Sequence, residues 1–277
     1  MNGSTVRIEN GKAQLDAGQE LFPWSASRLK KLLQCPRQFR FAYLDRLPIV
    51  AIAPLAFGRA VHEAVRIAHE EQMRNGELPP VGELLARFDA LWSEALQGEV
   101  LFRPSHPSPE RYHTMGHEAL RVFHMLNRAA PPPLMAELPF EIEVQHGDEV
   151  FRLRGVIDRV DETVSLAGQT ALVVIDYKSG ARKPTLDEAH ADVQLTLYAL
   201  ALREMTGIPV VSVEFHLLRD GLVLGSTRDE TALGQFTGEV LPYASKTLRS
   251  GLFAPRPGFW CNWCDFKEPC RREGGGA

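Results

Sequence analysis

The segment ALVVIDYKSG at residues 171–180 decides the fold class. Its run from Ala171 to Tyr177 is short and apolar, which is typical of a strand buried on both faces inside a sheet. Asp176 and Lys178 are two positions apart, so their side chains project from the same face of that strand. Because functional groups of α/β proteins collect at strand ends, we expect the chemistry of this protein at the end of this strand.

The segments before and after this strand predict a mixed β-sheet. Before it, apolar and polar residues alternate in two stretches joined by His146-Gly147-Asp148, a sequence typical of a hairpin turn. After it come a helical pattern and two further strands separated by a turn at Asp220-Gly221. The expected bounds are strands at 138–144, 150–160 and 211–217 and helices at 186–204 and 231–249. This order is typical of an α/β core.

The first half of the chain is predicted to be helical. Apolar residues recur there at helical spacing, Pro36 breaks the first helix, and Pro131-Pro132-Pro133 ends the helical part. The expected helices span 25–33, 57–71, 83–97 and 109–129, with a short helix carrying Phe39 and Tyr43 after Pro36. The sequence thus predicts one domain over 25–273, made of a helical part (25–133), an α/β core (134–250) and a cysteine-rich segment (251–273). Residues 1–24 and 274–277 are expected to be flexible.

Composition excludes several protein classes. The chain has 277 residues, of which 44% are hydrophobic and 24% are charged, so it is long enough for a buried core and is neither disordered nor fibrous. No apolar stretch reaches the roughly 18 residues of a membrane span, and the N-terminal MNGSTVRIENGKAQ has no apolar signal core. We therefore expect a soluble, cytoplasmic protein with no membrane partner.

Positive charge is concentrated in two segments, although the net charge is −4. Residues 25–46 hold six basic residues against one acidic residue, and residues 246–273 hold six against three. Most charge runs are solvated helix faces. These two segments, however, also contain all four cysteines of the chain.

The cysteines predict a metal centre. Cys261, Cys264 and Cys270 form C-x2-C-x5-C, and Cys35 lies far upstream. In a reduced cytoplasm this pattern favours metal or redox chemistry over disulfides, and the loop-like PRPGFWCNWCDFKEPC disfavours a thioredoxin-type pair. Four thiolates can hold either zinc or an iron-sulfur cluster, and the spacing alone does not decide between them. The alternative is four unliganded cysteines, because free buried cysteine is common.

A second group of polar residues predicts a site for a hard divalent cation. Asp158 ends an apolar run on the strand before Asp176, and two carboxylates beside Lys178 can bind such a cation and orient a water. The alternative is an ordinary salt bridge. Gln194 and Tyr198 are four apart on the predicted helix and so face the same way. His62 follows Gly58 by four residues and is either a ligand or a structural histidine.

At these residues the sequence resembles the PD-(D/E)XK nuclease superfamily, and within it the RecB-like exonuclease branch. The matching motifs, in order, are FGRAVH (57–62), GVIDRV (155–160), VIDYKSG (174–180) and QLTLY (194–198). Cys35 with the three later cysteines looks like the iron-sulfur staple of AddB nuclease domains and CRISPR-associated RecB-like exonucleases. Five motifs in this order are specific, although each one alone is weak. The resemblance covers about Ser25 to Cys270.

The resemblance implies a restriction-endonuclease-like α/β fold, a mixed β-sheet flanked by helices, and a set of residue roles. The implied Mg²⁺ or Mn²⁺ ligands are His62, Asp158, Asp176 and the carbonyl of Tyr177. Lys178 would assist the attacking water, while Gln194 and Tyr198 would support the site or contact substrate. Glu141 is a further acidic candidate. The implied [4Fe-4S] cluster, with Zn²⁺ as the alternative, would be held by Cys35, Cys261, Cys264 and Cys270.

The implied function is metal-dependent hydrolysis of DNA phosphodiester bonds, on single strands or free ends, in repair, recombination or defence. Basic side chains near the cysteines would track phosphates, namely Arg28, Lys31, Arg37 and Arg40. Nearby rings are available for base stacking or for core packing, namely Phe39, Tyr43, Trp260 and Trp263. No G-x4-G-K-[ST] motif occurs, so unwinding would need a helicase partner. The alternatives are a non-catalytic DNA-binding scaffold subunit and a zinc-stapled interaction domain.

Overall fold

A computed structural model describes residues 7–9, 12–14, 21–49 and 51–275. It divides the chain into two compact units, each assembled from separate segments. Unit 1 comprises Met1–Ile49, Phe140–Gly155 and Asp229–Ala277, and unit 2 comprises Val50–Pro139 and Val156–Arg228. Within the described residues, no helix combines the length and the apolar character needed to cross a membrane.

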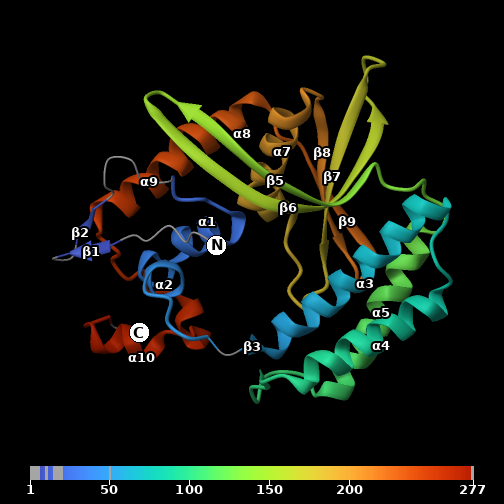
Figure 1. Ribbon diagram of the computed structural model, residues 1–277, viewed down its shortest axis with the longest axis horizontal. Coiled ribbons are helices and arrows are strands. Elements are labelled where there is room, and N and C mark those ends of the chain that lie inside the picture. The colour runs from blue at the N-terminus through green and yellow to red at the C-terminus, as the bar shows by residue number, and fades with distance from the viewer. Residues whose placement is uncertain (1–6, 10–11, 15–20, 50, 276–277) are drawn as a thin grey trace. The chain divides into compact units, whose positions relative to one another are not determined.

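The central sheet has five strands in the order β5-β6-β7-β8-β9 (Figure 1). Their bounds are β5 Met135–His146, β6 Glu149–Val164, β7 Thr170–Lys178, β8 Val210–Leu217 and β9 Leu222–Ser226. β7 pairs parallel with β8, whereas β6 with β7 and β8 with β9 pair antiparallel. The mixed sheet predicted from the sequence is therefore confirmed, and β7 lies at its centre.

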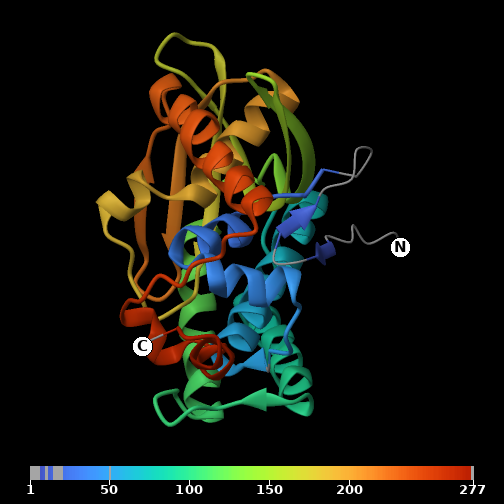
Figure 2. The ribbon, with the colours of Figure 1, turned by 90° about the vertical axis from the view of Figure 1, so that its left-hand side faces the viewer.

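Three long helices of unit 2 pack together: α3 Ala53–Asn75, α4 Val81–Gln97 and α5 Pro109–Asn127. They lie side by side in both ribbon views (Figures 1 and 2). Their shared core includes Phe57, Phe88 and Trp92, and Tyr177 of β7 joins the same core. Two short strands pair in parallel: β3 Ala51–Ile52, which directly precedes α3, and β4 Val100–Leu101, which lies between α4 and α5 in the sequence.

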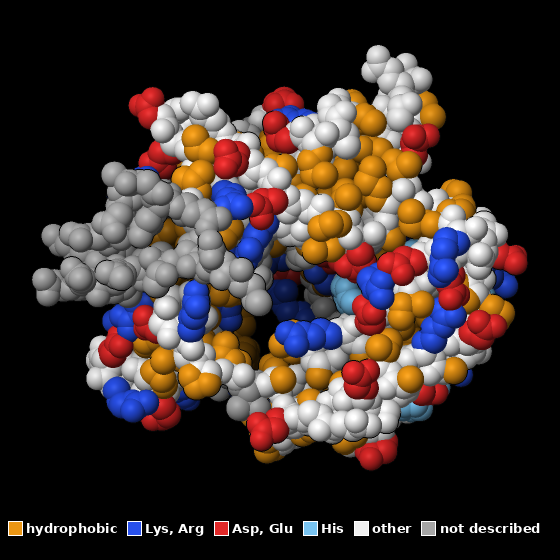
Figure 3. Space-filling view, in the orientation of Figure 1, with side chains coloured by type: hydrophobic (Ala, Val, Ile, Leu, Met, Phe, Trp, Pro, Cys, Tyr) orange, Lys and Arg blue, Asp and Glu red, His pale blue; other side chains and the backbone are white. Residues whose placement is uncertain are grey.

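The surface of these helices carries mixed charge. In the view of Figure 3, acidic and basic side chains are intermixed over α3, α4 and α5. Arg66 contacts Glu63 and Glu70, and Arg87 contacts Glu71. These are solvated, ion-paired helix faces, the ordinary origin of charge runs.

The single helix expected over 186–204 is wrong, because the chain forms two. α6 spans Leu186–His190 and begins at a capping box of Thr185 and Glu188, and α7 spans Val193–Thr206. The Asp192 side chain accepts hydrogen bonds from the backbone N–H groups of Gln194 and Leu195, so it starts a new helix at that point.

The helix expected over 231–249 forms with a local irregularity. It consists of α8 Glu230–Gln235, a π-helical turn η2 Phe236–Val240 and α9 Leu241–Ser250. Pro242 has no N–H to donate to the preceding turn and its ring crowds the carbonyl four residues before, which accounts for the wider turn there.

Unit 1 contains the remaining elements. They are β1 Arg7–Glu9, β2 Lys12–Gln14, α1 Ala26–Gln34, α2 Pro36–Phe39, η1 Arg40–Leu44, η3 Phe259–Trp263 and α10 Lys267–Arg272. Trp24 stacks on Phe39, which in turn stacks on Phe253. Trp24 also exchanges backbone hydrogen bonds with Arg152 and Arg154 of β6. The folded unit thus includes the end of the expected extension 1–24, while residues 1–6, 10–11, 15–20, 276 and 277 lie outside the described residues.

Candidate active site

Asp158 and Asp176 are brought together by the pairing of β6 with β7. The two strands run antiparallel, with Arg159 opposite Ile175. The backbone N–H of Tyr177 donates a hydrogen bond to Asp158 Oδ2 over 2.9 Å. Asp176 itself is only 1% exposed. A backbone bond from the central strand therefore fixes one carboxylate beside the other.

Lys178 lies on the same face of β7 as Asp176, as their two-residue spacing predicts. Its Nζ is 2.5 Å from Asp176 Oδ2 and donates to Gln194 Oε1 over 3.3 Å. It also lies 4.7 Å from the centre of the Phe215 ring. Within the described residues, Asp176 Oδ2 is buried and accepts no well-aligned hydrogen bond, although the Lys178 ammonium lies against it.

Gln194 and Tyr198 project from α7 toward the same carboxylate. Gln194 Nε2 donates to Asp176 Oδ1 over 2.6 Å and to the Tyr198 hydroxyl over 2.9 Å. The four-residue spacing seen in the sequence therefore does place both side chains on one face of the helix.

His62 reaches the same group from α3. Its Nδ1 lies 3.5 Å from Asp158 Oδ2. Glu137 of β5 completes a set with them, because one ligand atom from each of His62, Glu137 and Asp158 lies within 4.8 Å of the others. Sequence reasoning missed Glu137 and considered Glu141 instead. Glu141, however, is ion-paired with Arg152.

Glu137 was hard to find from the sequence. It lies an even number of residues from Glu141, so strand periodicity does not distinguish the two glutamates. Glu137 also has a positive φ of 47°, which is uncommon for a residue other than glycine and interrupts the regular strand. No sequence signal announces this conformation, and only the fold separates the two residues.

The electrostatics of the site follow from crowding of carboxylates. Burial and the neighbouring Asp176 raise the pKa of Asp158 well above its usual value. Burial likewise raises the pKa of Glu137 and lowers that of His62. Burial opposes the charge on Lys178, but Asp176 and Asp158 outweigh it and raise the pKa of that ammonium. Carboxylates this close together repel one another, and a bound divalent cation reduces that repulsion.

The donor set fits a hard divalent cation. Carboxylate oxygens are the ligands that Mg²⁺ prefers, and Mn²⁺ accepts imidazole as well. The buried Asp176 Oδ2 without an aligned donor is the kind of atom that such an ion satisfies. A groove of about 980 Å³ opens at this group and is lined by His62, Glu137 and Asp158 together with Gly58 and Arg59 of α3.

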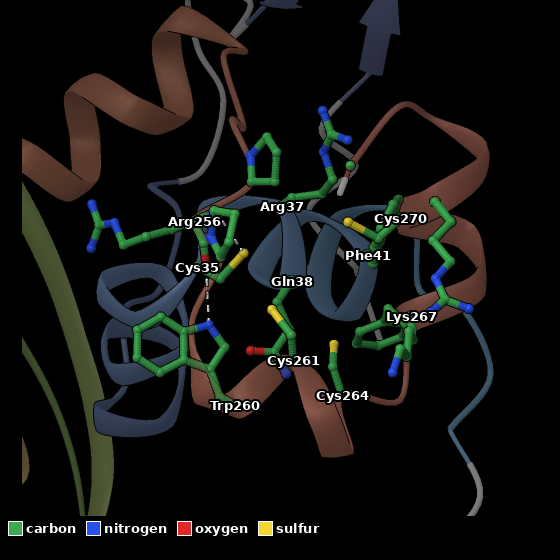
Figure 4. A pocket seen from close by; sticks show the side chains of 15 residues that line it. Cys35, Arg37, Gln38, Phe41, Arg256, Trp260, Cys261, Cys264, Lys267 and Cys270 are labelled. Carbon is green, nitrogen blue, oxygen red and sulfur yellow. Dashed lines mark hydrogen bonds between the residues drawn. The ribbon is translucent and has the colours of Figure 1, made fainter. Parts of the chain in front are cut away.

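The four cysteines line one cavity of unit 1 (Figure 4). Cys35 is buried beside α2, and its Sγ accepts a hydrogen bond from the backbone N–H of Arg256 over 3.4 Å. Among the residues that the structure describes, no three of the sulfur atoms lie within 4.8 Å of one another. Tetrahedral zinc would hold its thiolates about 3.8 Å apart, given Zn–S bonds of about 2.3 Å. The four thiols thus share one cavity, but their sulfur atoms are not as close together as a single zinc ion would hold them.

Three of the four basic residues expected to track phosphates are bonded within unit 1. Arg28 donates to the carbonyl of Pro23 and lies over the Phe22 and Tyr43 rings. Arg37 donates to the carbonyls of Phe253 and Glu273. Arg40 pairs with the carboxylates of Asp45 and Glu273. Lys31 is half-buried in the last turn of α1. Their role toward DNA stays a prediction.

The aromatic candidates divide by exposure. Phe39 is fully buried in the aromatic core of unit 1, with Tyr43 tilted against it, so its packing role is structural. Trp263 is 57% exposed, and Trp260 lines the cysteine cavity and donates its indole N–H to the carbonyl of Arg256.

Known proteins match this chain in sequence. Residues 23–271 match the sequence profile of the PD-(D/E)XK nuclease superfamily. The chain is 31% identical over 209 residues to an ATP-dependent helicase/deoxyribonuclease component from Symbiobacterium thermophilum, and the aligned region covers 65% of this chain and 17% of that protein. The chain thus spans about a sixth of the length of that relative. The solved structure of SSO0001 aligns with 92% of this chain and 89% of its own at 13% identity, with a TM-score of 0.38, which is too low to show a shared fold.

Proposed function

The chain belongs to the PD-(D/E)XK nuclease superfamily, and from that membership we propose that it is a Mg²⁺- or Mn²⁺-dependent deoxyribonuclease that hydrolyses phosphodiester bonds. The observation that carries the proposal is the convergence of Asp158 of β6 with Asp176 and Lys178 at the end of β7, where Asp158 lines a groove. Residues 25–273 act in this proposal as one nuclease domain.

Four groups of this chain hold the divalent cation in the proposal: His62, Asp158, Asp176 and the carbonyl of Tyr177. Glu137 is a fifth donor, supported by its place beside His62 and Asp158. A cation bound there supplies positive charge against the negative charge that develops on the phosphate. Asp158 is held in place by the Tyr177 N–H, so it is oriented before any ion arrives.

Lys178 serves as a cation that orients water or phosphate. Its raised pKa supports this role over that of a general base, because a base must lose its proton near the working pH. Gln194 fixes the ammonium and the carboxylate at once, since its Oε1 accepts from Lys178 and its Nε2 donates to Asp176. Tyr198 supports Gln194 through its hydroxyl.

DNA is the proposed substrate, as a single strand or a free end, and repair, recombination or defence is the proposed setting. The similarity to a protein named as a helicase/deoxyribonuclease component supports DNA and a helicase partner. The four cysteines hold a [4Fe-4S] cluster in this proposal, with zinc as the alternative. What supports a shared centre is that all four cysteines line one cavity of unit 1.

The test is a cleavage assay on end-labelled single- and double-stranded DNA. Anaerobically purified protein is assayed with Mg²⁺, Mn²⁺ or EDTA, beside Asp176→Ala and an Asp148→Asn control in the exposed hairpin turn. We expect metal-dependent cleavage by the wild type and the control, and none by Asp176→Ala. Intact DNA in the presence of DNA binding would instead support the non-catalytic scaffold, and full activity of Asp176→Ala would overturn the site.

A further inference from the structure

Asp89, His113 and His117 form a second group of metal-ligand type, separate from the residues described above. His113 and His117 are four apart on α5 and therefore lie on one face of that helix, and Asp89 is on α4. The Nε2 atoms of both histidines point at the same atom, Asp89 Oδ1, at 2.7 Å from His113 and 2.5 Å from His117. The two imidazole rings are 4.4 Å apart between centres.

A close approach of the two helices fixes this convergence. Gly116 lies between the histidines on α5, and a Cβ at that position would stand 2.0 Å from Cζ of Phe88, the residue before Asp89. The Phe88 ring is fully buried and packs about equally against His113 and His117, at 6.2 and 6.1 Å between ring centres. Only glycine permits this contact, so the backbone holds Asp89 within reach of both rings.

The three side chains have the chemistry of a zinc site. Two imidazoles and one carboxylate are a ligand set that zinc uses in proteins, with water in the fourth position. Imidazole ligands favour zinc and its transition-metal neighbours over Mg²⁺ and Ca²⁺. Asp89 Oδ1 already accepts from both imidazoles, so one carboxylate oxygen is the point on which the group converges.

The group is open to an incoming ion. The side chains of His113 and Asp89 are 43% and 44% exposed and that of His117 is 20% exposed. In the metal-free protein each Nε2 must carry a hydrogen to bond the shared oxygen, and a neutral histidine can move that hydrogen to Nδ1 and offer Nε2 to a metal. The contacts seen without metal are thus those that an ion between the three atoms would replace.

We propose that Asp89, His113 and His117 bind a Zn²⁺ ion that cross-links α4 and α5. The ion bridges two helices whose closest contact is already fixed by Gly116 and Phe88, so binding requires only small shifts of three side chains. Binding to the folded state alone stabilises it in proportion to the logarithm of the free zinc concentration, once that concentration exceeds the dissociation constant.

The test compares zinc binding by the wild-type chain, His113→Gln, Asp89→Asn and a His124→Gln control on the same helix. Zinc content is measured after dialysis against buffered free Zn²⁺, and the thermal midpoint is measured with zinc and with EDTA. Because all four proteins keep the cysteines and the carboxylates near His62, only the difference between them reports on this group. We expect wild type and control to bind one more equivalent than the two variants. Loss of a direct ligand should weaken this site by at least about 100-fold, the upper effect of an outer partner.

A second measurement needs no variant. Diethyl pyrocarbonate modifies accessible imidazole nitrogens, and mass spectrometry locates the modified residues. Zinc should protect His113 and His117 in the wild type and leave His124 unprotected. Equal zinc content in all four proteins, or modification of His113 and His117 that zinc does not change, would overturn the proposal. Protection by Cu²⁺ or Ni²⁺ but not by Zn²⁺ would overturn the assignment of zinc.

Discussion

Gln194 Nε2 donates a hydrogen bond to Asp176 Oδ1 over 2.6 Å. Because Asp176 is almost fully buried, this bond forms away from water and orients the whole carboxylate. The other oxygen, Oδ2, is thereby turned toward Lys178. One neutral amide on α7 thus sets the direction of a charged group on β7.

Substitution of Gln194 by Ala should lower the metal-dependent cleavage rate by about 10- to 100-fold, the usual effect of removing a partner that orients a metal ligand. Gln194→Glu should be at least as damaging, because it places a further carboxylate against Asp176. The rates are measured at saturating Mn²⁺, with circular dichroism to confirm folding. Gln97→Ala, at the exposed end of α4, is the control, and equal rates for Gln194→Ala and this control would contradict the role given to Gln194.

Conversion to Gln should weaken Mn²⁺ binding at Glu137 but not at Glu141. Glu137→Gln removes a negative charge beside Asp158, so the metal-free protein should have a higher thermal midpoint while its affinity for Mn²⁺ falls. Glu141→Gln breaks an ion pair with Arg152 and should leave Mn²⁺ affinity unchanged. Isothermal titration calorimetry with Mn²⁺ measures the affinity of both variants, and thermal unfolding without metal measures the midpoint. Weaker Mn²⁺ binding by Glu141→Gln alone would mean that the wrong glutamate has been assigned to the metal.

Cys264→Ser should lose the metal that we propose for unit 1 and lower the stability of the protein, because all four thiols line the same cavity. Burial raises the pKa of the Cys264 thiol, so the free thiol is protonated at neutral pH and a bound metal is what makes it a thiolate. Iron and zinc contents and the visible absorption of anaerobically purified protein measure the loss. The control is Asp265→Asn. Unchanged metal content in Cys264→Ser would refute the centre.

His69 should make the stability of the protein depend on pH. Its Nε2 is 2.8 Å from the Tyr177 hydroxyl and its Nδ1 is 3.1 Å from Gln72 Oε1, and the side chain is fully buried. Burial lowers the pKa of His69 from 6.5 to about 3. Because the folded pKa lies below the unfolded one, this contribution to stability is complete above about pH 6.5 and is lost as pH falls from there toward pH 3.

The linkage can be measured with His69→Gln. Between pH 6.5 and pH 5 the free energy of unfolding of the wild type should fall by about 2 kcal/mol more than that of the variant, at up to about 1.4 kcal/mol per pH unit for one proton. Urea unfolding at several pH values supplies both curves. Parallel curves would show that His69 is charged inside the folded protein or is not buried there.

Much of the candidate site was predictable because it depends on local periodicity. The two-residue spacing of Asp176 and Lys178 fixes their shared face in any strand, and the four-residue spacing of Gln194 and Tyr198 does the same in any helix. The mixed sheet followed from alternation, turn sequences and one apolar run. None of these inferences needs knowledge of which elements touch.

The features that the sequence did not reveal depend on long-range contact or on local competition between bonds. The Asp192 side chain caps the start of α7, so the chain forms two helices where the apolar periodicity predicted one. The group of Asp89, His113 and His117 exists only because α4 and α5 cross at Gly116. The basic residues near Cys35 looked free to meet phosphates, yet Arg37 and Arg40 are bonded to Glu273, more than 230 positions later.

The division of the chain into interleaved segments has a consequence for its synthesis on the ribosome. All of unit 2 has been made once residue 228 is complete, whereas unit 1 still lacks the segment that begins at Asp229. Cys35 emerges 226 residues before Cys261, and at about 5–20 residues per second this is a wait of roughly 10 to 45 s. During that interval the apolar faces of α1 and α2 have no α9 or α10 beside them, and a centre that needs all four cysteines cannot assemble before Cys270 has been made.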